Sequence, residues 1–361
     1  MVPDEKYYPG SQALYEKYQA ALKTDFKREN GTDGYTNKGL LTEFIGIRTK
    51  QNDDGSIEID MNGYKDDLIK RHGFLDSHRA SAPAKPGIIL SELDLAAPDA
   101  KNPPDVTKYR SRIGGTQWLA RGGLPIVGYQ VAALARFNHA PGKKHWDASS
   151  DMMRFLATSV DARICFKRTG KPLFYYVDSD FLPNYGTSFD NRRSTTGYCS
   201  YLAGACVAHC SRRQTTITTS TAHAEYLAAF ECGREAIRIR VLLQDMGLPQ
   251  QGATTIFEDN ETCIRMSEAD SSTPRTQYID VRYHWLREAV VHDKSLRLVH
   301  CSTTEMVADV LTKPLGSYEI ARFHGSMSGI KPISHPPLGG EYGRIGMSLH
   351  NPKDFPLLSD V

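Results

Sequence analysis

The stretch LFYYVDSDF, residues 173–181, places two carboxylates, Asp178 and Asp180, inside a run of aromatic and aliphatic residues. Such a run favours a buried β-strand, where aspartate is among the least favoured residue types. Burying a carboxylate without a partner costs several kcal/mol. Two interpretations are open. Either the strand ends near residue 177 and the acids lie in a polar turn, or Asp178 faces a metal ion whose charge offsets the cost of burial.

The composition is that of a globular protein. The chain has 361 residues, enough for two domains, of which 40% are hydrophobic and 24% are charged. The formal net charge of +2 provides no overall field for nucleic acid, so any basic surface must be local. The seven cysteines form no CxxC pair, which argues against a zinc site and indicates a reducing compartment.

The start MVPDEKYYPG lacks the apolar core of a signal peptide. No apolar run approaches the roughly 18 residues that a membrane span needs. We therefore expect an intracellular protein with no membrane partner.

The hydrophobic pattern before residue 172 is mainly helical. It predicts a helix over 11–26, a β-hairpin over 40–60 around the turn NDDG, and a helix over 63–74. Residues 80–108 are rich in Pro, Ala and Lys and indicate an extended linker, which further helices follow.

From residue 172 onward the pattern changes to strands. Three strands over 173–181, 196–204 and 205–213 precede a long helix over about 220–245. The strand TTIFEDN, further helices, the strand LRLVHCS and a final helix over 304–313 complete a mixed α/β plan.

Three further acids stand in apolar surroundings. Glu225 lies on the first turns of the long helix, Asp259 ends the strand TTIFEDN, and Asp309 lies in EMVADVLTK. Singly, each has a structural explanation, as a complement to a helix dipole, a helix N-cap and a solvated helix face. Together with Asp178, they are better explained by convergence on Mg²⁺, which prefers carboxylate oxygens. Two such ions about 4 Å apart can promote phosphodiester hydrolysis.

Residues 172–315 carry six motifs in an order that resembles the ribonuclease H domain of copia-type retrotransposon Pol polyproteins. They are YVDSDF, DNRRSTTGYCSYLAG, SRRQTTITTSTAHAEYLA, FEDN, PRTQYIDVRYHWLRE and ADVLTKPL. The resemblance implies a ribonuclease H-like α/β fold, a mixed five-stranded sheet with flanking helices. It also implies two Mg²⁺ ions, or Mn²⁺, as cofactors, with catalytic and metal-binding roles for Asp178, Glu225, Asp259 and Asp309. Asp180 would be a neighbour with a lesser role.

The first half resembles the end of the reverse transcriptase in the same polyproteins. The resemblance implies a polar segment over 1–37, a truncated and mainly helical thumb and connection region over 38–170, the ribonuclease H-like domain over 171–315 and a loosely ordered tail over 316–361.

The sequence GYKDD, residues 63–67, matches the polymerase signature Tyr-x-Asp-Asp. It leads into LIKRHGF with helical spacing instead of turning between two apolar strands. It therefore predicts a helix, and no palm segment with the true polymerase site is recognised in the chain.

Some positions depart from the family pattern. His223 stands where Glu is usual, Phe181 where Trp is usual, Tyr278 where His is common, and Arg238 where an aromatic residue is frequent. None removes a candidate metal ligand. Two alternatives stay open, a working nuclease and an inactive remnant that only binds nucleic acid or a polyprotein partner. A DNA-strand recombinase is disfavoured, because the spacing of the acids follows the nuclease motifs.

Basic and polar residues fall in the turns around the second and third strands. They are Arg192, Arg193, Ser194, Thr195, Arg212, Arg213 and Gln214. Taken alone they indicate solvated turns, whereas within the implied fold they would contact phosphates of an RNA–DNA hybrid.

The resemblance implies an endonuclease that hydrolyses the RNA strand of RNA–DNA hybrids. It also implies upstream reverse transcriptase and integrase portions of a polyprotein as partners, and a location in the cytoplasm, in virus-like particles, or in the nucleus.

Overall fold

The computed structural model describes residues 42–97, 99–158, 160–181, 193–269 and 280–331, together with 16, 17, 20, 21 and 24. Most of the predicted helix over 11–26 lies outside the described residues, as do Arg192 and Tyr278. No helix in the described part of the chain is long and apolar enough to cross a membrane.

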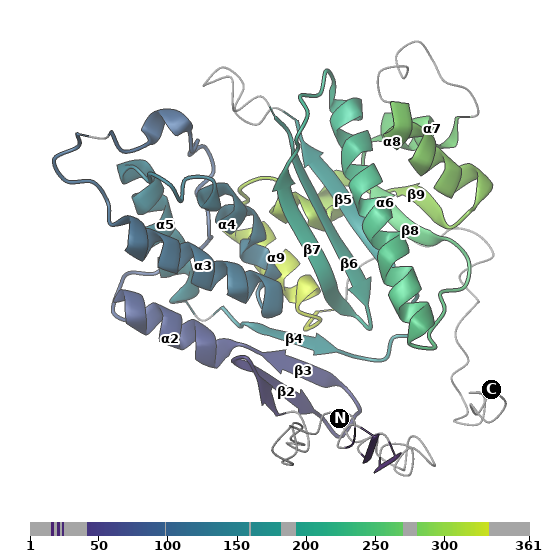
Figure 1. The fold of residues 1–361 in the computed structure, drawn as a ribbon, viewed down its shortest axis with the longest axis horizontal. Helices are drawn as coiled ribbons and strands as arrows, with labels where there is room; N and C mark the ends of the chain where they lie inside the picture. Colours follow the sequence, from purple (N-terminus) through teal and green to yellow (C-terminus); the bar gives the residue numbers. More distant parts are fainter. Residues whose placement is uncertain are drawn as a thin grey trace.

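A mixed five-stranded sheet forms the centre of the second half (Figure 1). Its strands, in spatial order, are β7 (Ala205–Arg213), β6 (Thr195–Leu202), β5 (Phe174–Asp180), β8 (Thr254–Glu258) and β9 (Leu296–His300). The neighbours β5, β6 and β7 are antiparallel, whereas β8 runs parallel to β5 and β9 parallel to β8. The expected mixed five-stranded sheet is confirmed.

The central strand β5 is covered on both faces, which explains why its sequence is apolar without alternation. Phe174 and Tyr176 belong to one hydrophobic core, and Tyr175 and Val177 belong to the other. The strand continues through Asp180. The interpretation in which it ends near residue 177 is therefore wrong.

Three helices pack with the second core: α6 (Thr221–Asp245), α7 (Glu261–Glu268) and α8 (Asp280–Arg287). The side chain of Ser220 caps α6 by accepting a hydrogen bond from the backbone N–H of His223. Tyr226 stacks on Tyr283 with ring centroids 5.1 Å apart, and its hydroxyl donates to the Tyr283 carbonyl at 3.0 Å. These contacts fix the first turns of α6, where Glu225 lies.

Between residues 42 and 170, the described part of the first half contains four α-helices and a small antiparallel sheet. The helices are α2 (Asn62–His72), α3 (Val106–Gly122), α4 (Gly128–Ala135) and α5 (Lys143–Leu156). The sheet consists of β1 (Glu43–Phe44), β2 (Ile47–Gln51), β3 (Ile57–Asp60) and β4 (Arg163–Phe166). The hairpin around NDDG is confirmed, whereas the short strand β4 was not predicted.

The sequence GYKDD lies in α2, as its helical spacing predicts. Lys65 is buried and donates to the carbonyl of Val160 at 2.6 Å, whereas the Asp66 side chain is exposed. This segment therefore stabilises the first half and has no polymerase geometry.

The two halves share the larger hydrophobic core. Leu134 and Phe137 of the first half belong to the same cluster as Tyr176, Tyr201 and Phe257 of the five-stranded sheet. Figure 1 shows α4 beside β7, with the small sheet and α2 along another side of the molecule. The domain boundaries given above remain a prediction.

The expected linker over 80–108 is not a free spacer. It contains the short 3₁₀ helix η1 (Glu92–Asp94), and α3 already begins at Val106. Leu90 and Ser91 are buried, and the Ser91 carbonyl lies 3.0 Å from Nε2 of His145 on α5. The segment is a strap packed against the first-half helices.

The expectation of a loosely ordered tail from residue 316 is wrong for its first part. Helix α9 (Ser317–Met327) buries Ile320, Phe323 and Met327 in the shared core. The spacing of these three residues is that of one helical face, a signal that the Gly- and Pro-rich composition further along the tail obscured.

The predicted final helix over 304–313 forms two short 3₁₀ turns instead, η5 (Thr303–Glu305) and η6 (Val307–Leu311). Gly197 of β6 lies opposite Asp178 in the strand register. A Cβ at Gly197 would lie 2.5 Å from Cγ2 of Thr312 and 2.9 Å from Cβ of Leu311. Glycine at this position therefore lets the segment with Asp309 lie directly on the sheet.

We predict that Gly197→Ala lowers the free energy of unfolding by about 1 to 3 kcal/mol, because the added methyl group overlaps η6 and the residue after it. The matched control is Gly114→Ala on α3, where a Cβ meets no atom within 4 Å. The control should be neutral or slightly stabilising, since Ala favours helices over Gly. Urea denaturation of both variants measures the difference, and equal stability of the two would contradict this packing.

Candidate metal centre

Three of the four predicted acids converge at one edge of the sheet. Asp178 lies near the end of β5, Asp259 directly follows β8, and Glu225 comes from α6. One carboxylate oxygen from each residue lies within 4.8 Å of the others. Because β5 and β8 are parallel neighbours, their carboxyl ends meet at the same edge, and this edge collects the acids.

The orientation of Asp178 and Asp259 is fixed by hydroxyl groups. Thr312 donates its hydroxyl to a carboxylate oxygen of Asp178. Thr303 donates to Oδ2 of Asp259 at 3.1 Å. Both donors come from the segment between β9 and α9, so this segment helps to shape the acid cluster.

The acids repel one another in a poorly solvated site. Burial, followed by the charges of Glu258, Asp178 and Asp259, raises the pKa of Glu225 to about 11. Burial also raises the pKa of Asp178, against the opposing effect of Lys313. The site therefore binds positive charge, from protons or from cations.

The residues present fit a divalent cation. Oε2 of Glu225 is buried and has no hydrogen-bond partner among the described residues. A buried carboxylate oxygen normally has a partner, and the three convergent acids offer the hard oxygen ligands that Mg²⁺ or Mn²⁺ prefers.

The fourth predicted acid, Asp309, lies beside this cluster and not within it. Its Oδ1 atom is 2.9 Å from Nζ of Lys313, which is also 3.9 Å from Oδ2 of Asp178. Burial and the neighbouring Asp178 raise the pKa of Asp309 to about 7, although Lys313 opposes the shift. Asp309 can therefore exchange a proton near neutral pH.

Two further acids belong to this edge of the sheet. Glu258, on β8, was not predicted. It is fully buried, and this burial raises its pKa. Its Oε1 atom accepts a hydrogen bond from the backbone N–H of Asn260 at 3.1 Å. The signal that could have revealed it was an acid directly after the β-branched and aromatic run TTIF, in the motif FEDN. Burial also raises the pKa of Asp180 to about 6.

Two of the residues predicted to contact nucleic acid are interior. Ser194 is fully buried and its hydroxyl lies 3.1 Å from that of Thr218. Gln214 is buried and donates to the Ala224 carbonyl at 2.9 Å and to Thr196 at 3.1 Å. In this structure, these two side chains hold β6, β7 and the start of α6 together and do not face a substrate.

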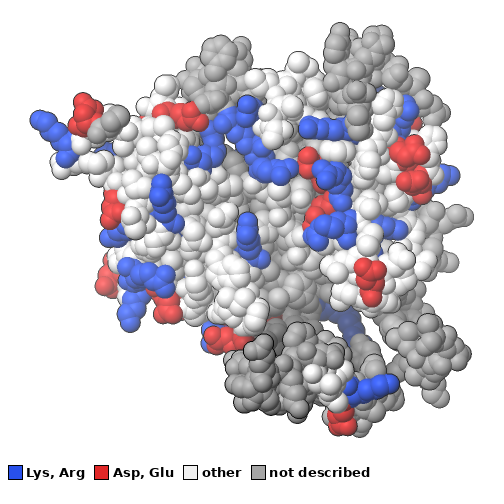
Figure 2. All heavy atoms as spheres, in the orientation of Figure 1, with Lys and Arg blue, Asp and Glu red and all other residues white. Residues whose placement is uncertain are grey.

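The other described members of that set lie at the ends of β6 and β7. Arg193 and Arg212 are exposed, and Thr195 lies opposite Arg213 in the strand register. Nη2 of Arg212 is 3.2 Å from Oε2 of Glu231. Figure 2 shows Lys and Arg side chains gathered near this end of β7. Contact with nucleic acid stays a prediction for these residues.

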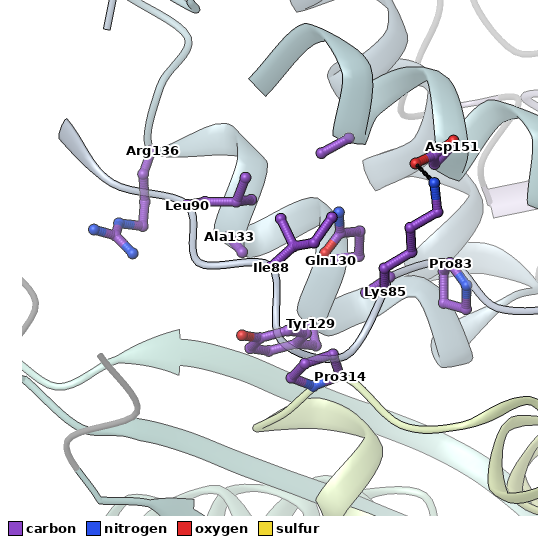
Figure 3. A pocket seen from close by; sticks show the side chains of 12 residues that line it. Pro83, Lys85, Ile88, Leu90, Tyr129, Gln130, Ala133, Arg136, Asp151 and Pro314 are labelled. Atoms are coloured by element: carbon purple, nitrogen blue, oxygen red, sulfur yellow. Dashed lines mark ion pairs between the residues drawn. The ribbon is translucent and has the colours of Figure 1, made fainter. Parts of the chain in front are cut away.

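A pocket lies between the strap and α4, and Pro314, the residue after Lys313, forms part of its lining (Figure 3). Tyr129 and Pro314 lie at one end, and the ion pair between Lys85 and Asp151, with a distance of 2.5 Å, lies at another. Burial and then the charge of Asp180 raise the pKa of Tyr129 to about 12. The first half therefore contributes a wall near Asp180, at the edge of the sheet where the acids lie.

The sequence is similar to transposon polyproteins. The chain is 29% identical over 288 residues to the retrovirus-related Pol polyprotein from transposon TNT 1-94 of Nicotiana tabacum, which covers 79% of this chain and 21% of the relative. It is 29% identical over 305 residues to the Pol polyprotein from transposon RE2 of Arabidopsis thaliana, covering 84% of this chain and 20% of the relative. The chain is a relative of copia-type retrotransposon Pol polyproteins. It spans about a fifth of the length of these relatives.

No protein-family model matches this relative of the Pol polyproteins. Among solved structures, it is similar to LC11-RNase H1 isolated from compost, with 14% sequence identity and a TM-score of 0.30, over 42% of this chain and 96% of that chain.

We predict that Glu225→Gln removes the stabilisation that divalent cations give to the protein. In EDTA at pH 8 the variant should melt at or above the wild-type temperature, because Gln is neutral without the proton that Glu225, with its pKa raised to about 11, must take up on folding. With Mg²⁺ or Mn²⁺ added, the melting temperature of the wild type should rise and that of the variant should not. Glu288→Gln, at an exposed acid directly after α8, should respond as the wild type does. A cation response of Glu225→Gln equal to that of the wild type would contradict the site.

We also predict a pH dependence that Asp309 controls. Its pKa is about 7 in the folded chain and near the ordinary value of 3.8 when unfolded. A raised folded pKa stabilises the protein below the unfolded pKa, and this contribution is lost as the pH rises through the folded pKa. In EDTA, the stability of Asp309→Asn relative to the wild type should therefore rise between pH 4 and pH 8. Denaturant titrations over this range measure it, and a constant difference would refute the shift.

Proposed function

We propose that the chain contains a ribonuclease H-type endonuclease domain that hydrolyses the RNA strand of RNA–DNA hybrids with two Mg²⁺ ions, as part of a retrotransposon Pol polyprotein. The observation that carries this proposal is the convergence of Asp178, Glu225 and Asp259 within 4.8 Å. The relationship to Pol polyproteins and the ribonuclease H-like sheet support it.

Each acid has a place in this proposal. Asp178 would be shared by the two cations, Glu225 and Asp259 would complete the ligands of one, and Asp309 would hold the other. Bound cations would supply the charge that lowers the pKa of a water molecule and stabilises the leaving oxygen of a phosphodiester.

The protein itself supplies the carboxylates and the hydroxyl groups that orient them. Hydroxyl donors from Thr312 and Thr303 orient Asp178 and Asp259 before any substrate arrives. Asp309, as a ligand of the second cation, would lie close to the nucleophilic water. Thr303, Asp309 and Thr312 all lie in the segment between β9 and α9.

Substrate contacts would come from exposed basic residues at the ends of β6 and β7. Arg193 and Arg212 lie on the same edge of the sheet as the acids. Arginine contacts phosphates without reading sequence, so binding should depend on groove shape and 2′-hydroxyls and weaken with salt. The polyprotein partners, and a location in virus-like particles or the nucleus, are proposed from the resemblance alone.

A cleavage assay tests the proposal. The intact chain with Mg²⁺ should cut the RNA strand of a labelled RNA–DNA hybrid and leave duplex DNA intact. Asp259→Asn should lower the rate by roughly 100-fold or more, since a ligand of the cations is lost. Asp293→Asn, at an exposed acid beyond α8, is the matched control and should keep the wild-type rate.

The outcomes are distinct. Binding of the hybrid without cleavage by the intact chain would leave the alternative of an inactive remnant that only binds. Equal cleavage by Asp259→Asn and the wild type would show that a contaminating nuclease is responsible.

A further inference from the structure

One lysine lies among the acids of the metal-binding edge. Nζ of Lys313 is 2.9 Å from Oδ1 of Asp309 and 3.9 Å from Oδ2 of Asp178. The two carboxylate side chains are only 11% and 5% exposed, whereas that of Lys313 is 33% exposed. The ammonium group therefore lies on the solvent side of two acids that would otherwise repel each other.

The backbone fixes this arrangement. Lys313 follows Asp309 by four residues, and its backbone N–H donates to the Asp309 carbonyl at 3.1 Å. Thr312, between them, donates its hydroxyl to Asp178 and its backbone N–H to the Asp309 carbonyl at 3.1 Å. One turn of chain thus carries an acid, a hydroxyl donor and a cation, all directed at the end of β5.

We propose that Lys313 is a positioning residue that serves as an internal counter-cation of the acid cluster, holding Asp309 beside Asp178 until a second divalent cation displaces its ammonium group. The proposal rests on the proposed function for one point only, that these acids bind divalent cations.

Geometry separates the places of the two cations. Oxygens of Asp178, Glu225 and Asp259 lie within 4.8 Å of one another, and of these three acids only Asp178 is within 4.0 Å of Nζ of Lys313, at 3.9 Å. Asp309, in contrast, is already paired with Lys313. A first divalent cation can therefore bind at the three acids, whereas a second one at Asp309 and Asp178 must compete with an ammonium group.

The lysine has room to move aside. Its side chain borders a small pocket together with Tyr129, Gln130 and Pro314. Figure 3 shows Tyr129 and Pro314 next to each other at this end of the strap and α4. The Lys313 stem is flexible, with a charge that is readily hydrated, so displacement toward solvent needs no change in the backbone.

Competition predicts that removing the charge tightens cation binding. Lys313→Met keeps an unbranched apolar stem and removes the ammonium group. The half-saturating Mn²⁺ concentration of the weaker site should fall about tenfold, since like charges a few ångströms apart repel strongly in a partly buried site. Lys313→Arg keeps the charge and should stay within about threefold of the wild type. Calorimetric titration of the full chain with Mn²⁺ measures both.

The matched control is Lys144→Met. Nζ of Lys144 is 3.2 Å from Oδ2 of Asp94, with similar partial exposure, but this ion pair joins α5 to the strap. Cation binding by this variant should equal that of the wild type. Unchanged or weaker Mn²⁺ binding by Lys313→Met would overturn the proposal.

A second experiment separates this proposal from the proposed function. In EDTA at pH 8, Lys313→Met should lower the urea midpoint, because Asp178 and Asp309 then repel each other without compensation. In a protein that already carries Asp309→Asn, Lys313→Met should lower the urea midpoint by less than half of this amount. Equal effects in both backgrounds would overturn the counter-cation role. If the wild type bound no Mn²⁺, the proposed function would fail, and this cycle would still decide whether Lys313 neutralises the acids.

Discussion

The structure depends on burying carboxylates that repel one another at one edge of a sheet. Asp178 and Glu225 are almost inaccessible to solvent, and Glu258 is fully buried. Such a cluster opposes folding unless protons, a lysine or metal ions supply positive charge. The raised pKa of Glu225 reflects its burial and the repulsion from the neighbouring acids. The repulsion among the buried acids lowers the stability of the cation-free protein. A bound cation would remove this repulsion, so the same feature favours cation binding.

The surrounding fold holds the acids against this repulsion. The β5 strand is packed on both faces, one covered by α6 and the other by the core that it shares with the first half. Gly197 leaves space for η6, and Thr312 and Lys313 follow at once. The helices that resemble the end of a reverse transcriptase thus contribute more than a linker, since α4 and the strap form a wall next to the segment that carries Asp309.

Much of the fold and of the acid cluster could be predicted from the sequence, where a family motif coincides with a clear hydrophobic pattern. β5, α6 and the acids at their ends were visible because Asp178 and Glu225 interrupt apolar runs. Glu258 was missed because its neighbour Asp259 explained the motif equally well, and burial of a whole strand cannot be read from five residues. The pairing of Lys313 with Asp309 depends on a local 3₁₀ turn, and the docking of α9 depends on a core that distant segments build together.

The most direct test of this account is a crystal structure of the protein soaked with Mn²⁺, with anomalous scattering used to locate the ions. The account predicts a strong anomalous peak within about 2.5 Å of carboxylate oxygens from Asp178, Glu225 and Asp259. Ions found only at surface acids, with these three side chains in place and no peak between them, would contradict it.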